Sequence, residues 1–141
     1  SGEAATEAVK KAKDADPPRA FRAVFVDIEH GINETRSKLE DRYNARVYAT
    51  VIRLLRDAGW TVGVYTAEWA EDAYFQHGLP QDLAVIASCI LWVASYNGGG
   101  YPNRVPDLWN DLDVAIWQYG NDGQIDGIDG NVDLNVELIE R

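Results

Sequence analysis

The 141-residue sequence contains no methionine, a single cysteine and few basic residues. Because methionine is absent, Ser1 cannot be a translation start, and we expect the chain to be part of a longer or processed polypeptide. The single cysteine, Cys89, has no partner within the chain, which excludes an internal disulfide as a source of stability. Its neighbours are apolar (Ile90, Leu91 and Trp92), so the sequence predicts a buried structural thiol.

Positive charge is also scarce, and this limits the partners that the chain can have. The sequence holds 13 Lys and Arg against 23 Asp and Glu, a formal net charge of −10, and no basic cluster offsets it. Such a charge repels phosphate backbones and anionic membrane surfaces, so we expect neither a nucleic acid nor a membrane as partner. No segment approaches the roughly 18–20 apolar residues that cross a bilayer, and no charged-then-apolar leader is present.

What the sequence does contain is a large apolar and aromatic fraction arranged in alternating strand and helix patterns. Hydrophobic residues make up 46% of the chain, with five Trp, seven Tyr and three Phe, which is enough for one packed domain over residues 1–141. Strand-to-helix order favours an α/β fold with parallel strands, either a barrel or an open sheet. The patterns predict helices over 3–14, 40–58 and 68–76, and strands over 23–29, 60–66, 89–96, 114–119 and 131–138.

Two carboxylates end the first predicted strand, Val24-Phe-Val-Asp27-Ile-Glu29. Because strand side chains alternate between faces, Asp27 and Glu29 share one face, roughly 6–7 Å apart. The carboxyl ends of strands are where α/β barrels place catalytic groups, and hydrolysis of a glycosidic bond uses two carboxyl groups, one of them as proton donor. The alternative is a structural pair that caps the next loop or binds an arginine.

Aromatic residues repeat on the faces of two later strands. Trp92 and Tyr96 share one face of their strand, and Trp117 and Tyr119 share one face of the next. The C–H faces of pyranose rings pack against aromatic planes, so these side chains predict a sugar-binding cleft. Ordinary core packing is the alternative explanation.

Taken together, several segments resemble glycoside hydrolase family 25, the Chalaropsis-type lysozymes, over residues 21–138. The resemblance implies a TIM-like (β/α) barrel of which this chain supplies strands four to eight. The matching segments are Phe25-Val-Asp-Ile-Glu29, Gly63-Val-Tyr-Thr66, Leu91-Trp-Val-Ala-Ser-Tyr96 and the ending Ile116-Trp-Gln-Tyr-Gly…Gly127-Ile-Asp-Gly-Asn-Val-Asp-Leu-Asn135.

The same resemblance implies a peptidoglycan hydrolase that cleaves the β-1,4 bond between N-acetylmuramic acid and N-acetylglucosamine. It implies that Glu29 is the general acid and that Asp27 and Asp133 are the accompanying carboxylates. It calls for no cofactor and no metal, and it places the chain outside the cytoplasm, at the cell wall or in a phage lysin. The expected substrate-binding residues are Tyr65, Trp92, Tyr96, Trp117, Tyr119 and Asn135.

The match has a gap, and two other interpretations stay open. Family members begin with a strand whose aspartate joins the site, and nothing in residues 1–20 matches it. We therefore expect another segment or chain to complete the barrel. A non-catalytic glycan-binding or structural domain derived from the lysozyme fold is the main alternative. The aspartate- and glycine-rich segment 122–133 also has some features of a calcium loop.

Overall fold

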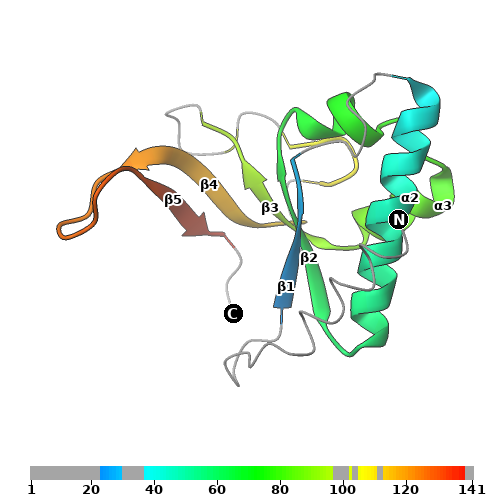
Figure 1. The fold of residues 1–141 in the computed structure, drawn as a ribbon, viewed down its shortest axis with the longest axis horizontal. Helices are drawn as coiled ribbons and strands as arrows, with labels where there is room; N and C mark the ends of the chain where they lie inside the picture. Colours follow the sequence, from blue (N-terminus) through cyan, green and yellow to red (C-terminus); the bar gives the residue numbers. More distant parts are fainter. Residues whose placement is uncertain (1–22, 30–36, 97–101, 103–104, 111–112, 139–141) are drawn as a thin grey trace.

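A five-stranded sheet with helices on one side forms the architecture of the chain (Figure 1). The computed structural model describes residues 23–29, 37–96, 102, 105–110 and 113–138; the helix predicted over 3–14 lies outside them. The elements are β1 (Ala23–Ile28), α2 (Lys38–Asp57), β2 (Thr61–Ala67), η1 (Glu71–Phe75), α3 (Pro80–Ala87), β3 (Ile90–Ala94), β4 (Val114–Gly123) and β5 (Val132–Glu137).

The strands follow one another across the sheet in the order β1-β2-β3-β4-β5. The first four run parallel, as predicted, whereas β5 pairs antiparallel with β4 and corrects the expectation of an all-parallel sheet. In the described part of the chain β1 and β5 are the two edges, so the structure shows a mixed α/β sheet. The partial barrel stays a prediction.

The long helix α2 is bounded by a capping serine at its start and a glycine after its end. Ser37 precedes it, and the Ser37 hydroxyl accepts a hydrogen bond from the backbone N–H of Glu40 at 3.1 Å, which caps the first turn. Gly59 follows its end with a φ of 94°, a left-handed conformation that glycine adopts without strain. Val47 and Leu55, two of the residues predicted for its apolar face, are 8% and 2% exposed.

Two short helical segments cover the same side of the sheet. The predicted helix over 68–76 is found as the short π-helical turn η1. The sequence prediction missed α3, which starts with Pro80 in its first turn and holds a buried acid, Asp82. The Asp82 carboxylate binds Arg46 at 2.9 Å and Arg53 at 3.4 Å, both on α2, and so joins the two helices.

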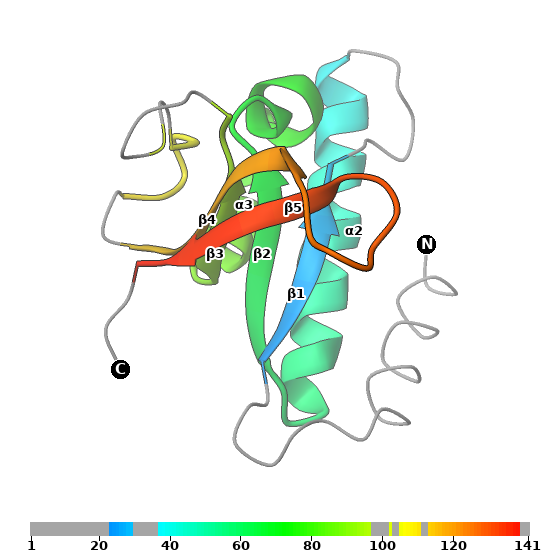
Figure 2. The same cartoon turned by 90° about the vertical axis from the view of Figure 1, so that its left-hand side faces the viewer.

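The hydrophobic core fills the space between the sheet and these helices. Ile28 is fully buried in it, and Val24 and Val26 pack against it, as their shared face predicted. Cys89 is 2% exposed and free, which confirms the buried thiol. No helix among the described residues has the length and apolar character to cross a membrane. Figures 1 and 2 show that the β4–β5 hairpin reaches out on the side of the sheet away from α2.

Candidate functional site

The two carboxylates of the first strand lie on the sheet face that α2 does not cover. Asp27 is exposed and Glu29 is half-buried, whereas Ile28 between them points into the core. On this open face the ring of Phe25 meets Trp92 edge-on, with centroids 5.5 Å apart. The predicted alternation along β1 is therefore correct, and it presents both acids at the carboxyl end of the strand next to an aromatic surface.

Tyr65 on β2 links the carboxylates to the rest of the site. It is the register partner of Asp27, and its hydroxyl lies within reach of the charge of Glu29. Its hydroxyl also donates a hydrogen bond of 2.7 Å to Oε1 of Gln118. Burial, followed by the nearby charge of Glu29, raises the pKa of Tyr65 well above its ordinary value. Tyr65 thus stays a neutral hydrogen-bond donor at physiological pH.

Gln118 on β4 is the residue at which the tyrosines meet. Its Oε1 also accepts a hydrogen bond of 2.6 Å from the hydroxyl of Tyr96, and the side chain is only 2% exposed. Sequence reasoning did not select Gln118. The available signal was an amide among the apolar and aromatic residues of a predicted strand, because a buried amide needs hydrogen-bond partners.

The last strand adds two of the predicted residues. The indole N–H of Trp92 donates a hydrogen bond of 2.8 Å to Oδ1 of Asn135, and the Trp92 ring lies 4.7 Å from that of Tyr65. Burial, then the negative charges of Asp133 and Glu29, raises the pKa of Tyr96 above its ordinary value. Asp133 and Asn135 on β5 therefore belong to the same neighbourhood as Glu29.

Two predicted cleft residues are placed elsewhere. Trp117 is 4% exposed, belongs to the core, and donates its indole N–H to the carbonyl oxygen of Ser95 at 2.8 Å. Its register partner is Val93, another core residue, so the side chain points away from the open face. Core packing, the alternative explanation, is correct for Trp117. Tyr119 is 41% exposed and its ring contacts that of Trp117, with centroids 5.7 Å apart.

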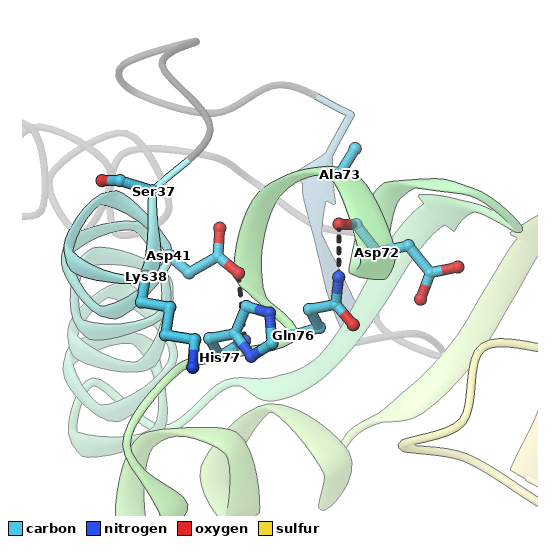
Figure 3. A pocket seen from close by; sticks show the side chains of 7 residues that line it. All are labelled: Ser37, Lys38, Asp41, Asp72, Ala73, Gln76 and His77. Atoms are coloured by element: carbon cyan, nitrogen blue, oxygen red, sulfur yellow. Dashed lines mark hydrogen bonds between the residues drawn. The ribbon is translucent and has the colours of Figure 1, made fainter.

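A cavity described by the structure lies outside this group of residues. Within the described ranges, no set of three or more His, Cys, Asp or Glu side chains could hold a metal ion. The cavity, of about 230 Å³, lies between the start of α2 and η1 (Figure 3), and none of the predicted site residues lines it. There the backbone N–H of His77 donates to Oδ2 of Asp41 at 3.0 Å, which holds η1 against α2.

The site thus combines carboxylates at a strand end with aromatic and amide side chains on one face of a mixed sheet. No family model and no curated protein matches the sequence, but the fold resembles several solved structures. One is the spore cortex lytic enzyme SleM of Clostridium perfringens, with a TM-score of 0.66 at 18% identity over 95% of this chain and 45% of that one.

A family 25 glycosyl hydrolase from Bacillus anthracis has a TM-score of 0.59 at 21% identity, covering 96% of this chain and 58% of that chain. The CTP1L endolysin has a TM-score of 0.61 at 17% identity, with 95% and 42% covered. The chain thus spans about half the length of these structures. At such identities the likeness establishes the fold, and it confirms at that level the resemblance to family 25.

Proposed function

We propose that this chain is the carboxyl-terminal part of the catalytic domain of a peptidoglycan hydrolase, with Glu29 as general acid. The bond cleaved is the β-1,4 linkage between N-acetylmuramic acid and N-acetylglucosamine. The observation that carries the proposal is the position of Glu29, which directly follows β1 at its carboxyl end and acts through its charge on Tyr65 of the aromatic sheet face. The fold shared with lytic enzymes supports the same conclusion.

In the proposed reaction Glu29, protonated, gives its proton to the oxygen of the glycosidic bond. The carbon–oxygen bond then breaks, and the sugar ring takes on positive charge in a transition state that resembles an oxocarbenium ion. Asp27 and Asp133 supply negative charge on the same face, which stabilises that cation or orients the acetamido group of the sugar. Water completes the hydrolysis and returns a proton to the carboxylate.

The residues around Glu29 hold it and the sugar in place. The Tyr65 hydroxyl, which lies within reach of the charge of Glu29, is held by the buried amide of Gln118. Trp92 is likewise fixed by its bond to Asn135. Tyr96, with 51% of its surface exposed, offers an aromatic face to a sugar ring.

Release of reducing sugar from purified peptidoglycan tests the proposal. Glu29→Gln keeps the shape of the side chain but cannot donate a proton, so we expect activity to fall by about 10²- to 10⁴-fold. The matched control is Glu40→Gln, which removes a carboxylate at the first turn of α2 and should leave activity unchanged. Circular dichroism of each variant establishes that it is folded.

Two results would contradict the assignment in different ways. Equal activity of the wild-type chain and Glu29→Gln would refute the role of Glu29. A folded wild-type chain that binds peptidoglycan without releasing sugar would favour the non-catalytic glycan-binding domain instead.

A further inference from the structure

Trp69 differs from the other tryptophans in its exposure. All five lie within the described residues, and Trp69 alone belongs to the exposed class, at 49%, whereas Trp109 and Trp117 are each 4% exposed. It follows the end of β2 by two residues, at the same edge of the sheet as Glu29. Its exposed indole is therefore available to a ligand at the edge of the sheet where Glu29 lies.

The backbone around Trp69 is anchored to the neighbouring strand end. The N–H of Glu68 donates to the carbonyl oxygen of Ala94 at 3.1 Å, and the Glu68 carboxylate accepts a hydrogen bond of 2.8 Å from the hydroxyl of Ser95. Ala70, on the other side, is fully buried. The indole is therefore carried by a fixed segment, and it would lose little conformational freedom on binding a ligand.

The ring itself is positioned by a second aromatic residue that also reaches the site. Tyr74 on η1 meets Trp69 edge-on, with centroids 5.8 Å apart and planes inclined by 64°. Tyr74 and Tyr65 both pack against the small cluster that includes Ala67 and Ala94. A continuous set of packed side chains thus runs from Tyr65, which lies within reach of the charge of Glu29, to Trp69.

We infer that Trp69 is the platform of an outer sugar-binding subsite, on which a pyranose ring of the glycan strand stacks beyond the ring held at Glu29. This inference rests on the proposed function. A glycan strand is a polymer that continues past the bond being cleaved, so a hydrolase gains affinity from rings that do not react. The flat indole provides an apolar face for such a ring, and its edge-on contact with Tyr74 fixes the orientation of that face.

Binding of soluble glycan strands, freed of their peptides and prepared as disaccharides and octasaccharides, tests this subsite. The measurement is the Kd by titration calorimetry in a Glu29→Gln background, which prevents cleavage during the titration. We expect Trp69→Ala to weaken octasaccharide binding by about five- to tenfold and disaccharide binding by less than about twofold. Trp69→Phe, which keeps a flat ring, should retain most of the affinity.

Two further variants guard against indirect effects. Trp69→Leu keeps apolar volume against Tyr74 but lacks the flat ring, so it should bind octasaccharides as weakly as Trp69→Ala while melting at the wild-type temperature. Tyr43→Ala removes an aromatic side chain of similar exposure, 41%, from α2, and it should bind both strands normally.

Each other result overturns the inference. If Trp69→Ala and Trp69→Leu bind octasaccharides as tightly as the parent, Trp69 forms no subsite, while the proposed function stands on the Glu29 experiment. Equal weakening for both strand lengths would place Trp69 in the central site and refute an outer subsite. If the parent binds neither strand, both the subsite and the proposed function fail.

Discussion

Replacing Gln118 by leucine should damage both the stability and the activity of the protein, because one buried oxygen serves two tyrosines. Oε1 of Gln118 accepts the hydroxyls of Tyr65 and Tyr96 at 2.7 and 2.6 Å, and the side chain is 2% exposed. Leucine fills a similar volume but accepts no hydrogen bond, so both hydroxyls lose this partner.

The size of the effect follows from the surroundings of each hydroxyl. A neutral hydrogen bond contributes about 0.5–1.5 kcal/mol net, and a donor left without a partner in a buried position costs more. Tyr96 is 51% exposed, so water can replace Gln118 as its hydrogen-bond partner. Tyr65 is partly buried, so the loss of its partner accounts for most of the lost stability. We expect a loss of about 2 kcal/mol in the free energy of unfolding, or about 6 °C in melting temperature for a chain of this length.

Thermal unfolding followed by circular dichroism measures this loss, and the peptidoglycan assay measures a fall in activity of about tenfold. The activity should fall because Tyr65, no longer held by Gln118, shifts and changes the surroundings of Glu29. Gln76→Leu is the matched control: Gln76 donates one exposed hydrogen bond to the carbonyl oxygen of Asp72, and its loss should cost less than about 0.5 kcal/mol.

A triple variant with Gln118→Leu, Tyr65→Phe and Tyr96→Phe tests whether the unpartnered hydroxyls cause the loss of stability. It removes the donors together with the acceptor, so no hydroxyl is left without a partner, and it should be more stable than Gln118→Leu alone. A triple variant less stable than the single one, or a single variant as stable as the wild type, would refute the account.

The structure predicts the change in stability for three other substitutions. Asp82→Asn, which weakens the joint with the two arginines of α2, should lower the free energy of unfolding in urea by about 1–3 kcal/mol; no change would show that the helices are held by apolar packing alone. Gly63→Ala should cost about 1–3 kcal/mol in the same assay, because the added methyl group collides with the ring of Phe25, and combining it with Phe25→Leu should recover part of the loss. Burial raises the pKa of Tyr48 from 10.0 to about 12, so the folded state holds a proton that the unfolded state has lost, and stability should fall as pH rises through that window; Tyr48→Phe should make the alkaline limb flatter, and an unchanged limb would contradict this.

The elements that were predictable from sequence are those whose pattern repeats over enough residues. The long helix and the five strands were found because α2 has several turns of apolar periodicity and β1 alternates between faces. The short helix α3 was missed because eight residues give little periodicity, although Pro80 in its first turn was a start signal. The direction of β5 depends on how the chain turns after Gly123, which alternation along a strand does not encode.

The site was predictable where a single strand determines it and not where two strands must be aligned. Asp27 and Glu29 share a face by the geometry of β1 alone. Whether Trp117 or Gln118 faces them depends on the register of β4 against β3, which includes an irregularity at Leu91 and Trp92. A shift of one residue exchanges the two faces, so the sequence favoured the aromatic residue and the structure presents the amide.

The order of the strands has a consequence for how the molecule is made. Each strand pairs with the strand that precedes or follows it in the chain, but the parallel pairs join residues far apart in sequence, such as Ala23 and Thr61, because a helix lies between the strands. Parallel pairs of this kind form slowly, whereas the antiparallel β4–β5 hairpin joins segments that are close together in the chain. Asp133 and Asn135 can therefore be placed beside β4 early in folding, and Glu29 joins them only when the parallel strands have paired.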